Sequence, residues 1–438
     1  MRKVLLIVFD FPPRRTSGVY RPVRFTKHLV GRDWLPTVVT IQGRKGEAED
    51  PTLLEKVPAV VRIVKTPYFR VAGWENRAVS VVRTAGAMQS PAREVRQPFM
   101  DRMLRRLAAF LRSSLYFPDD SLGWIPFGFA KAVKLLFEEP YDVVYSTSPP
   151  RAGLVIGLLL KLFLRVRWVA EFRDPWYLSP RPLRRRFERW LEGSIVRHAD
   201  AVVVVTHGHA EYLQNLYHPP EGKLAVVTNG FDEEDFAPNR IPVRTTLAPS
   251  RFHFSHFGTV YENFSGGFFP ALIELLRESP TLKERIRVNI IGIPDDAILQ
   301  YAREEELQGV LEIRPLLPHA DAIAAMYASQ CLLLFLGHPE YSRLAVSGKL
   351  YEYLRAGRHI LAMTYEGGAK TIIESAKAGW ALHPQDTEGI KRALREVLES
   401  NGNSLLTGPG RAEHVAQFRY DRLTAQLVKV LDRVSRDI

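Results

Sequence analysis

The sequence predicts an α/β protein with two doubly wound halves, in each of which helices cover a parallel β-sheet. Short continuous apolar runs, such as VLLIVFD at 4–10, alternate with helical segments, as is typical of parallel strands that are buried on both faces. The alternation begins again after residue 250. A chain of 438 residues is long enough for two or three domains, and 46% hydrophobic with 25% charged residues is the composition of a globular protein.

The first half begins with the strand VLLIVFD. A loop rich in proline follows this strand, and the first helix of the chain comes after the loop. That helix, near Val23–Val30, leads to a second strand, TVVTI at 37–41. Four more apolar runs predict strands at Val60–Val64, Asp142–Tyr145, Trp168–Phe172 and Ala201–Val205. This succession of buried strands and helices favours a parallel sheet.

The second half repeats the pattern after a connecting stretch near Asn229–Pro249. Strands are predicted at Phe252–Phe257, Val288–Ile291, Leu311–Arg314, Cys331–Leu336 and His359–Met363. Helices are predicted at Phe268–Arg277, Ala320–Ala328, Lys349–Ala356, Ala369–Ala378, Thr387–Leu398 and, at the end of the chain, near Arg422–Val434. We therefore expect a first domain of residues 1–240 with an insert at about 68–135, a second domain of residues 241–415, and a C-terminal helix within 416–438.

The positive charge of the chain lies in its first half. The net charge is +12, and residues 1–240 hold 37 Lys and Arg against 25 Asp and Glu, whereas residues 241–438 hold 23 of each. Such a split indicates that the first half faces something anionic, for which an anionic lipid, a phosphorylated acceptor and nucleic acid all qualify. No recognisable nucleic-acid-binding module accompanies the charge, so we expect no nucleic-acid partner.

The insert contains an amphipathic helix at about Phe99–Tyr116. Its apolar positions share one face, and four arginines fall on the opposite face, namely Arg102, Arg105, Arg106 and Arg112. Such a helix either packs on its own domain with solvated arginines or lies on an anionic membrane surface, and both interpretations stay open.

No segment of the sequence is apolar over the length that a membrane span needs. The longest run, near Leu154–Leu164, is interrupted by Lys161, whereas a spanning helix needs about 20 residues. The single cysteine, Cys331, lies in an apolar run and is expected to be a buried small hydrophobic residue. We expect a cytoplasmic protein that can associate with the inner face of the cell membrane.

Doubly wound sheets bind ligands at the carboxyl ends of their strands, so the loops there carry the candidate residues. Gly18 lies in the loop after the first strand, where a glycine lets the backbone approach a phosphate closely. Arg173 and Asp174 follow the strand at 168–172 in the segment EFRDPW. This pair could bind a sugar hydroxyl or orient a proton donor, and the alternative is a structural ion pair.

Two segments of the second half also carry candidate ligand-binding residues. Gly258 and Thr259 follow the strand at 252–257, in a turn that could hold a nucleotide diphosphate on backbone amides. Lys349 lies in the first turn of the next candidate helix, in SGKLYEYLRAG, where a cation opposes the helix dipole and often has an anionic partner. Glu352 lies one turn further on, and a carboxylate can accept from both hydroxyls of a ribose. The alternative is an exposed Lys–Glu pair on a surface helix.

Taken in order, these pieces resemble the retaining family 4 glycosyltransferases of GT-B fold. The matching segments are the PP…SG loop, YDVVYSTSPP at 141–150, WVAEFRDPW at 168–176, ADAVVVVTHGHAEYL at 199–213, VTNGFDEEDF at 227–236, FGTVY at 257–261 and SGKLYEYLRAGRHILA at 347–362. They cover nearly the whole chain. The resemblance implies two Rossmann-like domains that face a central cleft, with the C-terminal helix crossing back to the first domain.

The resemblance also implies an activity: transfer of a sugar, as by a hexosyltransferase, from a nucleotide diphosphate donor to an acceptor hydroxyl, in cell-surface glycan or glycolipid biosynthesis. The nucleotide-sugar is a substrate, and neither a metal nor a further cofactor is implied. Glu352 would hold the ribose, Lys349 or Arg343 the diphosphate, and Gly18 would approach the donor phosphate. The acceptor, a glycan or a lipid-linked glycan, would lie near Arg173 and Asp174.

One position departs from the family pattern. The first glutamate of the paired motif should lie eight residues before Glu352, and this chain has Leu344 there. Two other functions therefore stay open, a nucleotide-sugar epimerase of the same fold and an inactive protein of this fold that binds carbohydrate or a membrane. A requirement for an acceptor during turnover separates a transferase from an epimerase.

Overall fold

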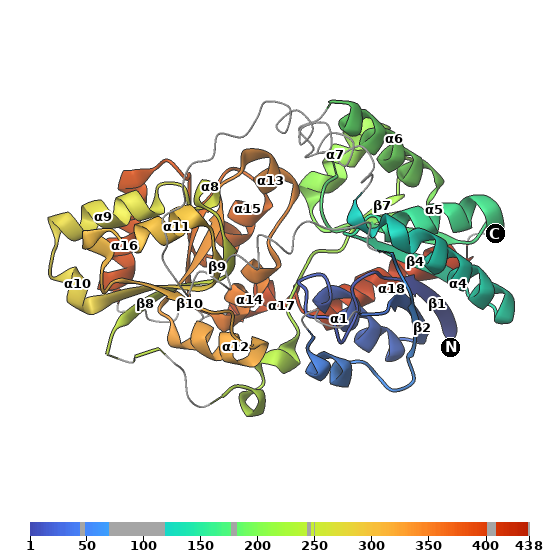
Figure 1. The fold of residues 1–438 in the computed structure, drawn as a ribbon, viewed down its shortest axis with the longest axis horizontal. Helices are drawn as coiled ribbons and strands as arrows, with labels where there is room; N and C mark the ends of the chain where they lie inside the picture. The colour runs from blue at the N-terminus through green and yellow to red at the C-terminus, as the bar shows by residue number, and fades with distance from the viewer. Residues whose placement is uncertain are drawn as a thin grey trace, which may run out of the picture. The chain divides into compact units, whose positions relative to one another are not determined.

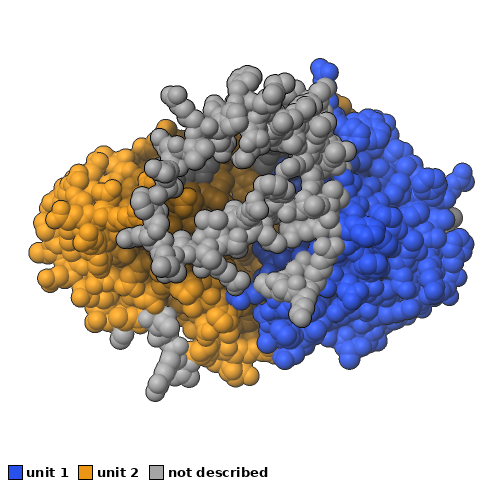
Figure 2. Space-filling view, in the orientation of Figure 1, with its two compact units in different colours: residues 1–203, 219–223, 431–438 blue, residues 204–218, 224–430 orange. Residues whose placement is uncertain are grey.

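The chain divides into two compact units in the computed structural model. Unit 1 comprises residues 1–203, 219–223 and 431–438, and unit 2 comprises residues 204–218 and 224–430 (Figure 2). The residues that the structure describes are 1–43, 49–69, 119–176, 182–242, 247–248, 250–400 and 409–436. Most of the basic insert expected at 68–135 lies outside these residues, and so does the whole amphipathic helix expected at 99–116.

Seven strands form the first sheet, in the order β3-β2-β1-β4-β5-β6-β7, and the pairs from β3 to β5 run parallel. The strands are β1 (Arg2–Ile7), β2 (Trp34–Ile41), β3 (Arg62–Thr66), β4 (Val143–Ser148), β5 (Trp168–Phe172), β6 (Ala201–Val204) and β7 (Leu224–Val226). Every strand predicted in the first half is present. Only the short strand β7, which is half-buried, was not predicted.

The order of the first sheet reverses between β1 and β4 (Figure 1). Because crossovers between parallel strands are right-handed, α1 (Tyr20–Val30) lies on one face, and α5 (Ala152–Leu164) and α6 (Pro182–His198) lie on the other. The carboxyl ends of β1 and β4 therefore flank a topological switch point, the place where doubly wound sheets bind ligands. The other helical segments of this half are α4 (Ile125–Glu138), α7 (His207–Tyr217), η1 (Pro51–Lys56), η2 (Asp120–Trp124), η3 (Glu233–Phe236) and η4 (Pro238–Arg240).

Six parallel strands form the second sheet, in the order β10-β9-β8-β11-β12-β13. They are β8 (Phe252–Val260), β9 (Ile286–Pro294), β10 (Leu311–Arg314), β11 (Cys331–Leu336), β12 (His359–Thr364) and β13 (Gly379–Leu382). The sequence predicts all of them except β13, whose residues are only half-buried. The predicted α/β class with two doubly wound parallel sheets is confirmed, and here the switch point falls between β8 and β11.

The second half contains helices that pack on both faces of this sheet and further helical segments, the last of which ends in unit 1. They are α8 (Glu262–Ser265), α9 (Phe268–Glu278), α10 (Leu282–Arg285), α11 (Asp296–Tyr301), η5 (Glu305–Leu307), α12 (His319–Ala328), α13 (Pro339–Leu344), α14 (Gly348–Ala356), α15 (Gly368–Ser375), α16 (Thr387–Glu399), α17 (Pro409–Ala416) and α18 (Tyr420–Arg436). Side chains of α9 and α16 pack on one face of the strands, and those of α12, α14 and α15 pack on the other.

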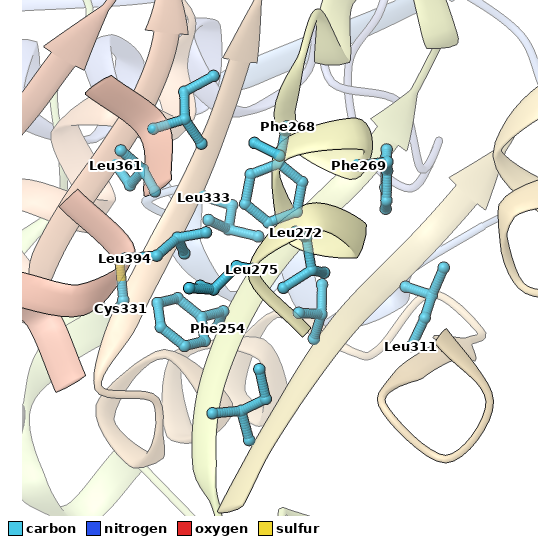
Figure 3. Close-up of a cluster of buried hydrophobic side chains, with 14 of the residues drawn as sticks. Phe254, Phe268, Phe269, Leu272, Leu275, Leu311, Cys331, Leu333, Leu361 and Leu394 are labelled. Atoms are coloured by element: carbon cyan, nitrogen blue, oxygen red, sulfur yellow. The ribbon is translucent and has the colours of Figure 1, made fainter. Parts of the chain in front are cut away.

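Alternate residues of one strand enter the two cores of unit 2. In β11, Cys331 and Leu333 lie in the cluster with Phe268 of α9 and Leu394 of α16, whereas Leu332 lies in the other cluster (Figure 3). Burial on both faces explains why this strand is apolar at every position. Cys331 is fully buried, as expected.

The last helix has residues in both units, because residues 431–438 belong to unit 1. Within unit 1, Trp34 Nε1 donates to Asp432 Oδ1 at 2.9 Å, and Arg2 Nη2 lies 2.8 Å from the same oxygen. Among the helices of the described residues, none combines the length and the apolar character needed to cross a membrane.

Candidate functional site

The candidate site of unit 2 lies where β8 approaches its carboxyl end. Gly258 has φ of +103°, a conformation that L side chains rarely adopt. The side chain of Lys349, in the first turn of α14, packs against this backbone. Its Nζ lies 2.5 Å from the position that a Cβ on Gly258 would occupy. A glycine at 258 therefore makes room for the lysine, and the two residues predicted separately from the sequence lie in contact.

Among the residues that the structure describes, none is a counter-ion in direct contact with the ammonium of Lys349. The ammonium makes no hydrogen bond or ion pair with the residues that the structure describes, and burial lowers its pKa to about 8, an effect that the Glu352 carboxylate opposes. The helix begins after Ser347, whose side chain caps none of the amides. A half-buried cation at a helix N-terminus without a side-chain cap is a suitable partner for an anionic group.

Glu352 is one turn further along α14 and faces a histidine that the sequence analysis did not identify. Its Oε1 lies 3.2 Å from Nε2 of His319, the first residue of α12. Nδ1 of His319 lies 3.9 Å from Oδ2 of Asp235, a buried carboxylate in η3. His319 belongs to no motif and directly precedes the helix predicted at 320–328, so the sequence contained no signal for this contact.

His256 supports the same strand end from within unit 2. Its ring nitrogens lie 3.0 Å from the Leu333 carbonyl oxygen and 3.3 Å from the Thr259 carbonyl oxygen. Burial, reinforced by the charge of Lys349, lowers the pKa of His256 to about 3. The imidazole is therefore neutral near pH 7, so its single N–H can donate to only one of these two carbonyl oxygens. The side chain of Thr259 itself is exposed.

The structure gives no hydrogen bond or ion pair between the side chain of Arg343 and the described residues Gly258, Lys349 and Glu352. Arg343 is exposed at the end of α13 and lines two cavities of unit 2, one of about 680 Å³ between α7 and α15 and one of about 390 Å³ beside Lys370. The next residue, Leu344, is 3% exposed, and its carbonyl accepts a hydrogen bond from Thr206 Oγ1 at 2.6 Å. The position expected to carry the first glutamate of the paired motif is thus filled by a buried apolar side chain.

In unit 1, Arg173 joins the loops on both sides of the switch point. Its Nη1 donates to the Gly18 carbonyl at 2.7 Å, Nε donates to the Ser148 carbonyl at 3.4 Å, and Nη2 donates to the Pro149 carbonyl. All three nitrogens of the guanidinium therefore donate to main-chain oxygens of the loop after β1, of the last residue of β4 and of the loop that follows it. This arrangement makes Arg173 a residue that positions the Gly18 loop.

Asp174, the next residue, has a different environment. The structure gives its carboxyl no hydrogen bond to a described residue, and burial raises its pKa, while the neighbouring Arg173 charge opposes that shift. The carboxylate of Glu171, by contrast, is fully engaged, since it accepts from Arg21 at 2.8 Å and from Thr147 at 2.6 Å. Asp174 is thus the carboxyl at this strand end that can still serve a ligand.

The structure therefore groups the predicted site residues by unit. Gly258, Lys349 and Glu352 come together in unit 2, and Gly18, Arg173 and Asp174 come together in unit 1. Among the described residues, no group of three or more His, Cys, Asp and Glu side chains is placed to hold a metal ion.

In sequence, part of the chain resembles known glycosyltransferases. The model of Glycosyltransferase Family 4 matches residues 71–235. The D-inositol 3-phosphate glycosyltransferase of Geodermatophilus obscurus is 24% identical over 253 residues, which are 54% of this chain and 53% of that protein. The enzyme of the same name from Corynebacterium urealyticum is 25% identical over 311 residues, 66% of this chain and 71% of that protein. The chain spans about half the length of the first of these relatives.

Solved structures share the fold over nearly the whole chain. Sucrose-phosphate synthase from Thermosynechococcus elongatus has a TM-score of 0.65 at 13% identity, over 99% of both chains. Anabaena HepE in complex with UDP has a TM-score of 0.63 at 16% identity, over 99% of this chain and 100% of that one. The fold is that of the GT-B glycosyltransferases, and the resemblance to family 4 that the sequence indicates is confirmed.

Proposed function

We propose that the protein is a glycosyltransferase that moves a sugar from a nucleotide diphosphate donor to an acceptor hydroxyl. The observation that carries the proposal is the placement of Lys349 across Gly258, with Glu352 one turn along the same helix. An ammonium without a described partner suits a diphosphate, and a nearby carboxylate suits the two hydroxyls of a ribose. The names of the sequence relatives support the same class of activity.

In this function Lys349 stabilises the leaving group. Negative charge grows on the diphosphate as its bond to the sugar breaks, and a preorganised cation in a partly buried site lowers the energy of that state. The pKa of about 8 leaves the free lysine mostly protonated at pH 7. A bound diphosphate then raises the pKa of Lys349 again, so the ammonium is fully charged when the sugar is transferred.

UDP is the donor nucleotide that we propose first. HepE has been crystallised with UDP and with UDP-glucose, and it shares the fold of this chain. We also propose that Lys349 and the N-terminus of α14 neutralise the diphosphate without a metal ion. A chelator such as EDTA should then leave the affinity for UDP unchanged.

The acceptor is proposed to meet unit 1 at the carboxyl ends of β4 and β5. Arg173 holds the Gly18 loop, and Asp174, with its raised pKa, can accept a proton from the attacking hydroxyl. The positive charge of residues 1–240 suits an acceptor that carries phosphate, such as a lipid-linked glycan in cell-surface glycan synthesis at the membrane. We propose retention of the anomeric configuration, through attack on the face that the diphosphate leaves.

Thermal unfolding in the presence of UDP, GDP, ADP and CDP tests the donor site. A ligand present at 100 times its Kd stabilises the folded state by about 2.7 kcal/mol, so the correct diphosphate should raise the Tm clearly. Turnover of the matching nucleotide-sugar is then followed with and without candidate acceptors. Turnover that needs no acceptor and changes only the sugar would indicate an epimerase, and no shift with any diphosphate would contradict the proposal.

A further inference from the structure

A histidine lies between two carboxylates where α12 meets α14 and η3. The two helices lie side by side (Figure 1), with His319 as the first residue of α12 and Glu352 in the middle of α14. Nε2 of His319 lies 3.2 Å from Oε1 of Glu352, and Nδ1 lies 3.9 Å from Oδ2 of Asp235 in η3. One of these two acidic side chains, Glu352, is the carboxylate proposed to hold the ribose of the donor.

The two distances indicate which ring nitrogen of His319 carries a proton. An ionised carboxylate only accepts hydrogen bonds, so a bond to Glu352 requires an N–H on the imidazole. The 3.2 Å between Nε2 and Glu352 allows a hydrogen bond, whereas the 3.9 Å between Nδ1 and Asp235 is too long for one. His319 is therefore assigned as the donor to Glu352 through Nε2, and Asp235 places a second negative charge on the other side of the ring.

Limited exposure distinguishes this contact from a surface ion pair. The side chains of His319, Glu352 and Asp235 are 19%, 16% and 4% exposed. A free glutamate side chain loses rotamer freedom when a ligand orders it, and a hydrogen bond that already fixes the carboxylate reduces that cost. A carboxylate has about four acceptor positions, so the bond from His319 leaves it the capacity to accept from ribose hydroxyls.

We infer that His319 is a positioning residue for the donor, which holds Glu352 in the orientation that accepts from the ribose hydroxyls. Its effect on the donor passes through Glu352, so it sets the preference for a ribonucleotide over a deoxyribonucleotide. The contact between Lys349 and the diphosphate does not depend on it. His319 has this role only if Glu352 binds the ribose, so the inference rests on the proposed function.

A separate set of contacts joins the same three elements. Arg355, nearly one turn after Glu352 in α14, donates to Glu233 of η3 at 3.0 Å and to the hydroxyl of Tyr327 in α12 at 3.1 Å. These bonds connect α12, α14 and η3 without His319, so we expect variants at 319 to fold. Tyr327→Phe is the matched control, because it removes a hydrogen bond between the same two helices that does not involve Glu352.

Calorimetric titration with UDP and 2′-deoxy-UDP, or with the same pair for whichever diphosphate raises the Tm, tests the inference. The wild type should bind the ribonucleotide more tightly. His319→Ala should weaken its binding by up to about 20-fold, the equivalent of the rotamer freedom that Glu352 regains. The preference for ribose over deoxyribose should fall at least about threefold. Tyr327→Phe should keep the preference of the wild type within about twofold, whatever its Tm.

Two amide substitutions make the same test with a smaller change in packing. The amide nitrogen of glutamine has about the reach of Nε2, whereas that of asparagine has about the reach of Nδ1. His319→Gln should therefore keep the preference for ribose within about twofold, and His319→Asn should lose it as the alanine variant does. Loss of the preference in both amide variants would contradict a role as hydrogen-bond donor through Nε2.

A double-mutant cycle separates positioning from direct contact with the donor. If His319 acts through Glu352, His319→Ala should add less than about twofold to the loss of affinity that Glu352→Ala causes. Losses that multiply would show that His319 acts on the donor by itself and would overturn the inference. In turnover, His319→Ala should raise KM and change kcat less than about threefold, because the ribose contact is the same in the ground state and the transition state.

The inference and the proposed function can fail separately. A His319→Ala variant that keeps the full preference of the wild type for ribose would overturn the inference and leave the proposed function intact. A wild type that binds none of the nucleoside diphosphates would contradict the proposed function and the inference together. Far-UV circular dichroism and urea titration establish that each variant is folded.

Discussion

Lys349 occupies the space that a side chain at position 258 would need. Its Nζ lies 2.5 Å from the would-be Cβ of Gly258, a separation at which a real Cβ would force the ammonium away. The contact joins the end of β8 to the first turn of α14, two segments about 90 residues apart in sequence. It brings a strand-end backbone and a half-buried cation into one candidate anion site.

Gly258→Ala is expected to displace Lys349. The added Cβ collides with the ammonium, and the backbone at φ +103° is strained for any L side chain, at a cost of about 1–2 kcal/mol. The affinity for UDP should fall at least about tenfold because the cation leaves its site. Gly309→Ala is the matched control, since Gly309 also has positive φ (+71°) but nothing lies within 4 Å of its would-be Cβ. Both variants should lose similar stability in urea titrations, and only the first should lose UDP affinity; equal UDP affinity in the two would disprove the displacement.

Glu352→Ala is expected to remove a hydrogen bond to the ribose of the donor. Loss of a charge-assisted hydrogen bond weakens binding by about 1.5–3 kcal/mol, roughly 10- to 150-fold in Kd. The wild type should also bind 2′-deoxy-UDP less tightly than UDP, and the variant should not distinguish them. Glu388→Ala, at an exposed glutamate of α16 that pairs with Lys391, is the control. A variant that still discriminates between the two nucleotides would show that Glu352 does not contact the ribose.

Arg173→Met is expected to destabilise unit 1 without weakening UDP binding. The substitution leaves the carbonyls of Gly18 and Pro149 without this donor, and buried unsatisfied groups cost about 1–3 kcal/mol each, partly relieved by water. The Ser148 carbonyl keeps the hydrogen bond from the main-chain N–H of residue 173. We expect a loss of about 2–4 kcal/mol in the free energy of unfolding, measured by urea titration. Arg173→Lys should restore only part of the lost free energy of unfolding, because one ammonium nitrogen cannot reach the carbonyls that three guanidinium nitrogens bind in the wild type. A stable Arg173→Met protein that lacks activity would instead indicate direct contact with a substrate.

Asp174→Asn is expected to keep or raise the thermal stability of the protein and to lower its kcat. Burial raises the pKa of Asp174, so the folded state holds this proton more tightly than the unfolded chain does. The resulting stability is present at low pH and is lost as the pH rises through the raised pKa. The neutral amide avoids that loss, so at pH 7 the variant should have the same or a higher Tm. If the carboxylate accepts the proton of the acceptor, kcat should fall about 10²- to 10⁴-fold. An unchanged kcat would remove Asp174 from the chemistry.

The regular elements of the buried sheets were predictable from sequence because burial acts on every residue of a central parallel strand. The strands at Trp168–Phe172 and Cys331–Leu336 have the predicted bounds. Strands β7 and β13 were missed because they are three and four residues long and only half-buried, so that apolar character does not mark them.

The candidate site was predictable only where one local segment carries the signal. Lys349 and Glu352 share a helix, so their spacing alone places them together. His319 reaches Glu352 from another helix, and Arg173 binds carbonyls of two loops distant in sequence. Such contacts depend on how the elements pack, and a single sequence does not record that. Arg343, predicted as an alternative ligand of the diphosphate, lines the two cavities, and its role stays a prediction.

The central claim is that Lys349 binds the diphosphate of a nucleotide-sugar donor, and calorimetric titration with UDP and with uridine between pH 7 and 9.5 tests it most directly. The pKa of about 8 means that free Lys349 loses its proton as the pH rises through 8, whereas the bound diphosphate requires the ammonium. The Kd for UDP should therefore rise up to about tenfold per pH unit above 8, with proton uptake on binding, and uridine should show no such dependence. Lys349→Met should bind UDP more weakly and without this pH dependence, and Lys134→Met, at an exposed lysine of α4, should behave as the wild type. If UDP does not bind, or if Lys349→Met binds UDP with the affinity and pH profile of the wild type, the claim is contradicted.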